Sequence, residues 1–372
     1  MNNKTVFPGV ILFLLSVFLF SSCWNKITKE DGTASIIIFP PPPDTTRIQF
    51  LTKISNSADV TGTRTAFAKL VFGNADEALT FSKPYGVAMH KGKLYVCDNP
   101  IHGLEIIDFE NNSFDYFIPT GKGQLQMPLN CDVDDNGYIY VADALRMQII
   151  VFDEKGDYIT CFGEKENFKP TDVYVKDNKI WVVNLAGHKI NVYSKDSTDK
   201  LLFSFPDSKD GKEEYLYSPT NICVTDDKVY VTDVGACKIK TYSHKGIYLN
   251  SVGSTGKGLG QFVRPKGIAV DRDSNLYVVD ASFENVQIFN SKGQLLMFFG
   301  GAYTGSGYMC LPSKVIIDYD NISYFQQYVD PSFTLKYLII VVNQYGPDKI
   351  NIYGYVEPAK AGLTPENNNG NK

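Results

Sequence analysis

The stretch FVRPKGIAVDRDSNLYVVDASFENVQIFNSKGQLLMFFG, Phe262–Gly300, contains four short apolar runs separated by polar turns. The runs cover residues 267–270, 276–279, 286–289 and 295–299. Short runs of β-branched and aromatic residues between turn residues predict a meander of four antiparallel strands. One such sheet cannot bury both of its faces alone, so the stretch predicts that the chain contains further copies.

Six copies are present, and each begins with a proline. The prolines are Pro84, Pro128, Pro170, Pro219, Pro265 and Pro312, separated by 44, 42, 49, 46 and 47 residues. The second strand recurs as LYVCD (94–98), IYVAD (139–143), IWVVN (180–184), VYVTD (229–233), LYVVD (276–280) and IIVVN (339–343). A period in the forties with four strands per copy is typical of propeller blades. We therefore expect an all-β, six-bladed β-propeller.

The repeated motifs resemble NHL repeats. The resemblance rests on P-x-G-[IV]-A at Pro84 and Pro265, on the [LI]-Y-V-x-D strands and on the I-x-[VI]-[FY] strands that follow them, and it covers roughly 46–357. It implies the propeller architecture but little chemistry, because the NHL family spans lyases, RNA binders and protein-docking scaffolds.

The first 22 residues predict an export signal. Lys4 precedes the apolar run 10–20, and Ser21-Ser22 stand before Cys23. Eleven apolar residues are too few to span a bilayer as a helix. The arrangement resembles a bacterial lipobox, although Phe20 stands where Leu is commonest, and it implies that Cys23 carries acyl chains. An ordinary secretory signal is the alternative. We expect a cell-envelope protein that is lipid-anchored to a membrane, with the outer membrane favoured.

The remaining organisation follows from the repeats. Residues 23–45 predict a lipid-anchored tether, in which the prolines 40–43 favour an extended polyproline segment, although the Ile-rich piece before them could instead pack on the propeller. Residues 46–357 form the propeller, and 358–372 a disordered tail. The strand 47–54 has no proline-anchored unit before it, and the sixth copy lacks a fourth strand. We therefore expect strand 47–54 to close the last blade.

Composition argues against nucleic-acid binding. The chain of 372 residues has a net charge of −5, and removing Lys4 with the leader changes this charge to −6. An acidic exported protein is a poor nucleic-acid binder. We expect a propeller that is monomeric and that meets an envelope protein or a small polar ligand.

Cysteine and histidine positions predict neither a disulfide framework nor a zinc site. No spacing among the six cysteines after Cys23 forms a CxxC pair, and four of them fall inside predicted strands, which favours buried thiols. Zinc-dependent NHL lyases place histidines around the channel. The residue after each blade proline is never His here, and His102 and His188 fall in turns. We expect no cofactor, apart from a divalent cation such as calcium in the channel.

Two sets of polar residues recur by position. The acid or amide that ends each second strand predicts hydrogen bonds to backbone amides of the next turn. The position two after each proline reads Gly86, Asn130, Asp172, Asn221, Gly267 and Lys314. If the first strands line the axis, Asn130, Asp172, Asn221 and Lys314 ring the channel mouth and could bind a hydrated cation or small polar ligand around Asp172. A water-filled channel is the alternative.

The loops and one insertion offer further binding surfaces. Loops from fourth to first strands share a face with turns from second to third strands, which carry Arg146, Lys189 and Lys238. The Gly-Lys-Gly pieces at 121–123 and 256–258 predict turns, because neither has P-loop spacing. The insertion 321–333 in the last copy has four aromatic residues that either pack on the wall or dock a partner. These residues are Tyr324, Phe325, Tyr328 and Phe333.

These observations favour a non-catalytic binding or assembly scaffold of the bacterial cell envelope. Rigid propellers present loops from several blades on one face, which suits recognition without chemistry. The alternative is a metal-dependent hydrolase or lyase with its site at the channel mouth. No nucleophile with an assigned base is evident in the sequence, so no catalytic residue is predicted.

Overall fold

A computed structural model describes residues 36–62, 78–163 and 166–359 of the chain. The predicted leader, Cys23, the tether up to residue 35 and the tail from residue 360 lie outside the described residues. No helix in the described part of the chain is long and apolar enough to cross a membrane.

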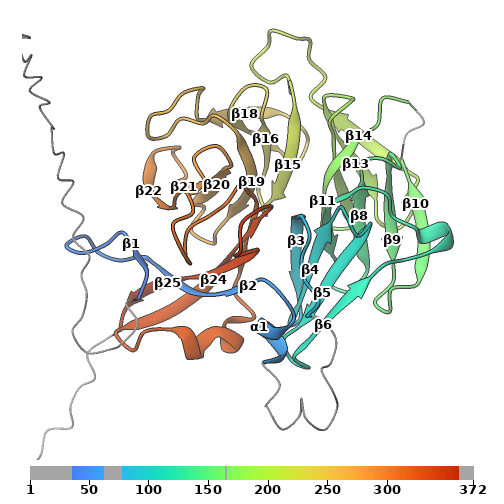
Figure 1. Ribbon diagram of the computed structural model, residues 1–372. Coiled ribbons are helices and arrows are strands. Elements are labelled where there is room, and N and C mark those ends of the chain that lie inside the picture. The colour runs from blue at the N-terminus through green and yellow to red at the C-terminus, as the bar shows by residue number, and fades with distance from the viewer. Residues whose placement is uncertain (1–35, 63–77, 164–165, 360–372) are drawn as a thin grey trace, which may run out of the picture. The chain divides into compact units, whose positions relative to one another are not determined.

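The described residues form six antiparallel sheets, as predicted from the repeats. Figure 1 shows the blade order clearly for β22, β21, β20 and β19, which run from the outside to the middle. Blade 1 contains β3 (Pro84–His90), β4 (Lys93–Asp98), β5 (Gly103–Asp108) and β6 (Ser113–Phe117). Blade 2 contains β7 (Pro128–Val133), β8 (Ile139–Asp143), β9 (Gln148–Phe152) and β10 (Tyr158–Phe162). Blade 3 contains β11 (Pro170–Lys176), β12 (Lys179–Asn184), β13 (Lys189–Ser194) and β14 (Leu201–Phe205).

The remaining blades follow the same plan with one addition. Blade 4 contains β15 (Pro219–Val224), β16 (Lys228–Asp233), β17 (Lys238–Ser243) and β18 (Tyr248–Val252). Blade 5 contains β19 (Pro265–Val270), β20 (Leu276–Asp280), β21 (Asn285–Phe289) and β22 (Leu295–Gly300). Blade 6 contains β23 (Pro312–Asp318), β24 (Phe333–Asn343), β25 (Ile350–Pro358), β2 (Ile48–Ile54) and β1 (Ile38–Phe39). Short helical turns are α1 (Ala58–Thr61), η1 (Gly121–Gly123) and η2 (Ile322–Tyr328).

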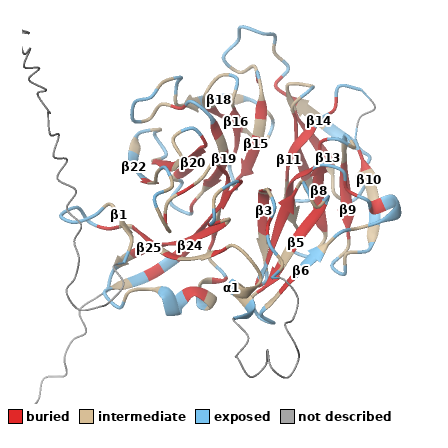
Figure 2. Cartoon of the chain, in the orientation of Figure 1, coloured by how far each residue is buried: buried red, intermediate tan, exposed pale blue. Residues whose placement is uncertain are grey.

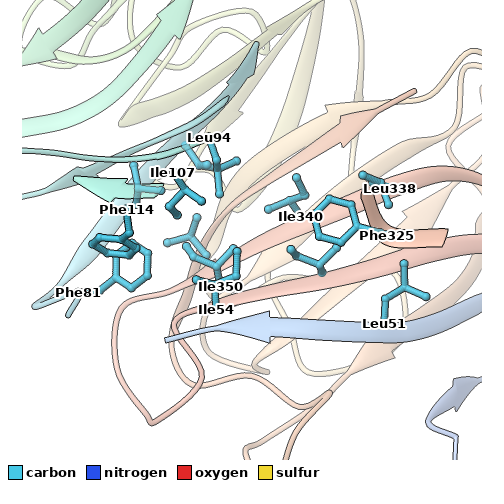
Figure 3. Packing of buried hydrophobic residues seen from close by; sticks show 14 of the residues in the cluster. Leu51, Ile54, Phe81, Leu94, Ile107, Phe114, Phe325, Leu338, Ile340 and Ile350 are labelled. Carbon is cyan, nitrogen blue, oxygen red and sulfur yellow. The ribbon is translucent and has the colours of Figure 1, made fainter. Parts of the chain in front are cut away.

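The N-terminal strand closes the ring, which confirms the prediction for residues 47–54. β2 pairs antiparallel with β25, with Ile54 opposite Ile350 and Ile48 opposite Tyr355. Figure 3 shows the apolar cluster at this closure, where Leu94 and Ile107 of blade 1 lie near Ile340 of blade 6. The seam between the first and last blades is therefore a packed core built from both ends of the chain.

The segment before β2 packs on blade 6, which decides between the two expectations for it. β1 pairs with β2, and the amide of Arg47 donates to the carbonyl of Phe39 across the proline-containing connection. The ring of Phe39 lies 6.2 Å from the ring of Phe299. Of the two readings that the sequence leaves open, the described residues favour packing of the Ile-rich piece on the propeller, because burial of its apolar side chains holds it on the sheet.

Packing between neighbouring blades forms the core. The middle strands are buried on both faces, whereas exposed residues lie mainly in loops and outer strands (Figure 2). Each blade proline lies opposite the acid or amide that ends the second strand, as Pro84 lies opposite Asp98. Proline has no N–H group to donate to the sheet, so within a sheet it is found at places such as the first residue of a strand, which is where these prolines lie. The regular register places equivalent residues of all first strands around one channel.

We use two names for the ends of this channel. The loop face carries the connections from fourth to first strands and the turns between second and third strands. The turn face carries the turns between first and second strands and those between third and fourth strands.

Candidate functional site

The side chains predicted to ring the channel mouth form a buried layer across the channel. Asn130, Asp172 and Asn221 are fully buried, and Lys314 is 6% exposed. The Nζ atom of Lys314 in blade 6 lies 2.6 Å from Oδ2 of Asp172 in blade 3. Asn221 donates to the same oxygen over 3.3 Å, as does the Ile222 amide over 3.0 Å. We call Asn130, Asp172, Asn221 and Lys314 the polar layer.

Two glycines complete this layer because the first strands approach closely there. A Cβ atom on Gly86 would lie 2.4 Å from Oδ1 of Asn130, and one on Gly267 would lie 2.4 Å from Cα of Lys314. No side chain fits at either distance. The channel is therefore narrow at the polar layer, so these residues do not form an open mouth.

The polar layer does not favour the predicted cation at Asp172. Oδ1 of Asp172 accepts from the Val173 amide, and Oδ2 already has three donors, including the Lys314 ammonium. A cation would have to displace this ammonium or lie beside it, which like-charge repulsion opposes. Among the described residues, no group of three or more His, Cys, Asp and Glu is placed to hold a metal ion.

A cavity of about 190 Å³ lies along the channel between Lys314 and the turn face. The first strands of all six blades line it, and its surface is about as polar as apolar. Its polar groups include Asp132, Tyr174, Cys223, Lys314 and Asp318. We call this space the channel cavity. It is a concave space with convergent polar groups on partly apolar walls, a form that small-molecule sites take.

Asp132 is the unusual titratable group of the channel cavity. Protein atoms surround its carboxyl group although the cavity reaches it, and this burial raises the pKa of Asp132 to about 7. Amide donors from Val175 and Val133 and the charge of Lys314 oppose the rise, and Asp172 adds to it. Burial likewise raises the pKa of Cys223 to about 12. The cavity thus combines a carboxyl group that titrates near neutrality with a thiol that stays protonated.

The channel cavity adjoins a second hollow of about 360 Å³ on the turn face. Asp132 and Tyr174 line both spaces. The second hollow is also lined by Asp134, which pairs with Lys195 over 2.6 Å, and by the exposed Asp177. The channel cavity therefore connects to solvent on a polar, aspartate-containing surface.

Asp132 was not among the residues predicted to line the channel. The position four after each blade proline reads Ala88, Asp132, Tyr174, Cys223, Ala269 and Ile316, and all six residues line the channel cavity. Asp132 is the charged member of this set. Side chains two residues apart on a strand point to the same side. Asp172 was predicted from the second residue after each blade proline, and the fourth residue after each proline identifies Asp132 in the same way.

The residues that end the second strands are structural, as predicted. Asp143 accepts from the amides of Gln126 and Met127 before blade 2 and from those of Leu145 and Arg146 in the following turn. The other five second strands end on equivalent acceptors, namely Asp98, Asn184, Asp233, Asp280 and Asn343. Each one fixes the segment that leads into its blade's first strand.

The predicted basic loop residues are partly used within the propeller. Arg146 donates to the carbonyls of Lys122 and Gln124 over 2.9 and 2.6 Å, and Lys238 pairs with Glu213 over 2.7 Å. Lys189, at the start of β13, is half-buried. These contacts confirm that the loops from fourth to first strands share one face with the turns between second and third strands. They also give Arg146 and Lys238 a structural role, because each fixes a loop of this face to a neighbouring turn.

Two of the histidines contact backbone carbonyl groups of the loop face. Nδ1 of His102 lies 2.6 Å from the carbonyl oxygen of Gln126, and Nδ1 of His188 lies 3.1 and 3.0 Å from those of Leu216 and Tyr217. Both side chains join a turn of one blade to the segment before the next blade.

The six cysteines of the described chain are free. Cys97, Cys131 and Cys223 are buried inside strands, as predicted.

The insertion of blade 6 packs against blade 1, which favours the first of its two predicted roles. Phe325 is 3% exposed, and its ring lies 5.1 Å from the ring of Phe109. Tyr324 covers Gly92, and Phe333 packs against the same core. Tyr328 is 42% exposed. Docking through Phe325 is excluded by this burial, and only Tyr328 of the four aromatics stands clear of the wall.

Large exposed apolar side chains gather on the loop face. Among the residues that the structure describes, eight lie in the loops and turns of this face, whereas two lie on the turn face, Ile247 and Tyr328. The eight come from five connections between or within blades and form what we call the apolar loop set. They are Ile118, Met127, Leu145, Met147, Tyr217, Leu259, Val263 and Tyr345.

Comparisons with known proteins agree with the fold. The family model DUF5128, described as 6-bladed beta-propeller, matches residues 210–297, which include blade 4 and most of blade 5. No curated protein matches the chain. The NHL assignment stays a prediction.

Several solved structures are similar to the chain. An inactive variant of virginiamycin B lyase from Staphylococcus aureus, solved with quinupristin, is 15% identical; the match covers 73% of this chain and 94% of the lyase with a TM-score of 0.51. A protein of unknown function from Bacteroides thetaiotaomicron is 14% identical, with 84% and 76% covered and a TM-score of 0.56. A gluconolactonase from Xanthomonas campestris is 14% identical, with 88% and 98% covered and a TM-score of 0.51. Identities this low show a shared fold alone.

Proposed function

We propose that this protein is a non-catalytic binding protein of a bacterial cell envelope, anchored through acyl chains on Cys23, whose loop face docks a protein partner. The observation that supports the proposal is the apolar loop set. Leu259 is 74% exposed and Leu145 is 60% exposed, and they project from different blades. Exposed apolar side chains concentrated on one face are typical of interaction sites, whereas isolated ones are ordinary.

The surroundings of this set define the partner's chemistry. Exposed Lys122 and Lys257 lie in the same loops as Met127 and Leu259, and exposed Asp207, Asp210 and Glu213 lie in the loop of Tyr217. Apolar side chains with charges of both signs among them fit a partner surface that has apolar groups and complementary charges. The rigid blades hold the loops in place, so docking requires little ordering of the face.

The enzymatic alternative has no comparable observation. Its predicted site at Asn130, Asp172 and Asn221 needs open ligand positions for a metal ion, and the Lys314 ammonium occupies the centre of that group. The similarity to a lyase and a gluconolactonase is a similarity of fold.

The docking surface can be tested by site-specific photo-crosslinking in cells. A photo-crosslinking amino acid placed at Leu145 or Leu259 is expected to join one partner of the same mass. The same amino acid at the exposed Leu249 and Leu296 of the outer strands is the control. Leu145→Glu with Leu259→Glu should abolish capture from a third loop-face position, Tyr345, while the purified variant melts like the wild type. Equal crosslinking from the control positions, or capture that survives both glutamates, contradicts loop-face docking.

The anchor has a separate test. Cys23→Ser is expected to move the protein from the membrane fraction to the supernatant and to abolish labelling by an alkyne fatty acid. Unchanged labelling of this variant would disprove acylation at Cys23, and it would leave the loop-face experiment unaffected.

A further inference from the structure

We propose that the channel cavity binds a small organic monocation, a primary amine of about benzylamine size, with its ammonium group on Asp132 and its apolar body against the first strands. This site lies between the polar layer and the turn face, so it is separate from the loop-face docking surface and does not depend on it.

The charges along the channel do not balance. Asp132 lines the channel cavity, and Lys314 lies at its inner end in an ion pair with Asp172. Lys314 also acts on Asp132, so one ammonium serves two buried carboxyl groups. A buried carboxylate without a full partner either takes up a proton or attracts a cation. A monocation at Asp132 restores neutrality to the channel.

The walls favour an organic cation over a metal ion. The side chains that face the cavity include the apolar Ala88, Ala269 and Ile316 and the ring of Tyr174. Calcium and magnesium need about six oxygen ligands, which these walls do not offer. An apolar cavity of 150 Å³ holds benzene, so about 190 Å³ has room for one ring and an aminomethyl group.

The turn face provides a path that favours cations. The second hollow leads to Asp132 past Asp134 and Asp135. The turns between first and second strands of blades 4 and 5 carry Asp226 and Asp273 on the same face, and Asp226 pairs over 2.8 Å with Lys176 at the hollow. Acidic groups at the entrance raise the local concentration of cations and their rate of association.

Several titratable groups surround Asp132. Tyr174 and Asp172 belong to β11, Lys314 to β23, Cys223 to β15 and Tyr140 to β8. His90 ends β3, where its charged neighbours are Lys91, Asp135 and Asp134. Burial raises the pKa of Asp132 and keeps the Tyr and Cys groups neutral below pH 8, and it lowers the pKa of His90 below its usual 6.5, so the Asp132 variant is needed to separate these two groups. A proton on Asp132 competes with the ligand, so amine affinity must fall as the pH decreases through about 7.

Calorimetry with two matched probes on the purified propeller tests the proposal. At pH 8 benzylamine should bind at least about tenfold more tightly than the neutral benzyl alcohol, because only the amine forms a charge-assisted hydrogen bond. Between pH 8 and pH 5 the amine affinity should fall to about the level of the alcohol, because only about 1% of Asp132 is ionised two pH units below its pKa. The alcohol affinity should not change.

Two variants assign the effect to this residue. Asp132→Asn keeps an acceptor for the Val175 amide and should reduce amine binding to the level of the alcohol, whereas Asp115→Asn in the outer strand β6, an exposed residue away from both hollows, should bind like the wild type. Circular dichroism checks that both variants fold. The wild-type comparison of the two probes needs no variant, so it decides the question even if Asp132→Asn misfolds.

An ammonium can also come from a lysine side chain, so Nα-acetyl-lysine amide is used as a second amine. Tighter binding of this compound than of benzylamine assigns the cavity to lysine side chains, and weaker binding assigns it to free amines. Equal affinities for benzylamine and benzyl alcohol, or no amine binding at millimolar concentration, overturn the proposal.

Discussion

Lys314 and Asp172 occupy the same position in their blades, the second residue after the blade proline. Their ion pair closes the channel, and it also occupies the carboxylate that a metal ion would need. The two side chains reach across the axis from opposite blades, and both are buried. Burying two charges costs desolvation energy, so the pair contributes less to stability than its short distance suggests. Removing one partner of the pair is strongly destabilising, because the remaining charge stays buried without a partner.

Lys314→Met should therefore reduce the free energy of unfolding by about 3–5 kcal/mol. Adding Asp172→Asn to this variant should restore most of the loss, because the uncompensated carboxylate is removed. Urea unfolding of the two single variants and the double variant measures the coupling, with the exposed Lys292→Met as the control. A single variant that is as stable as the double variant would contradict this account.

Glu105 is a second buried charge position, and it makes stability depend on pH. Burial and the neighbouring Asp98 carboxylate raise the pKa of Glu105 to about 10, and neither of its carboxyl oxygens has an N–H or O–H donor. The equivalent residues Lys240, Gln287 and Asn351 donate to loop carbonyls instead. Glu105 is therefore neutral in the folded protein and ionised in the unfolded chain at neutral pH.

The sign of this effect follows from linkage. Between pH 4.5 and about 10 the unfolded chain loses the Glu105 proton while the folded protein keeps it, so stability decreases as the pH rises. Glu105→Gln should have the wild-type pH-dependence below pH 4.5 and gain up to about 3 kcal/mol relative to it by pH 7. Urea unfolding at both pH values checks this, with the exposed Glu110→Gln as the control. A difference between the variants that does not change with pH would contradict the assignment.

At the scale of elements, the insertion between β23 and β24 serves the seam between the first and last blades. η2 places Phe325 in the cluster of Figure 3, and Asn321 accepts the Gly92 amide over 2.8 Å. Gln49 of β2 donates to the carbonyl of Tyr328, at the other end of η2. The insertion thus contacts blade 1, blade 6 and the closing strand together.

Phe325→Ala should cost about 3–5 kcal/mol of unfolding free energy, because it removes a fully buried ring from this seam. Tyr328→Ala on the same helical turn should change stability by less than about 0.5 kcal/mol, because its side chain is exposed. Thermal unfolding of the two variants compares packing with exposure inside one element. Equal losses would show that η2 is not anchored through Phe325.

At the scale of the whole molecule, β2 makes the propeller a closed ring. It buries Ile48, Leu51 and Ile54 and covers the edge of β25. Each of these side chains contributes about 2 kcal/mol through burial, and the uncovered edge would offer a template for aggregation. The stability of the whole propeller therefore depends on β2, whose residues are far in sequence from the other strands of blade 6.

Stepwise truncation tests this dependence. A protein that begins at residue 36 should unfold at the wild-type temperature, and one that begins at residue 46 should lose only the small contribution of β1. A protein that begins at residue 55 should aggregate or lose its cooperative transition. Size-exclusion chromatography and circular dichroism distinguish these outcomes. A stable monomer that begins at residue 55 would show that the ring does not need its N-terminal strand.

The sequence by itself determined the number of blades, the order of their strands, the closing strand and the acceptor role of the second-strand ends. These features repeat in the blades or depend on local patterns of turns and apolar residues. Residues such as Asp143 and Pro265 recur at equivalent positions of the repeats, so they can be recognised in the sequence alone.

The site was decided by tertiary structure. Lys314 and Asp172 are 142 residues apart, and only the curvature of the ring brings them to one point. The place of Asp132 at a cavity, the burial of Phe325 and the packing of Phe39 on blade 6 likewise depend on contacts between distant segments. Periodicity in a sequence specifies which face a residue belongs to, but the distance across a channel and the charge balance inside it arise only when the blades close.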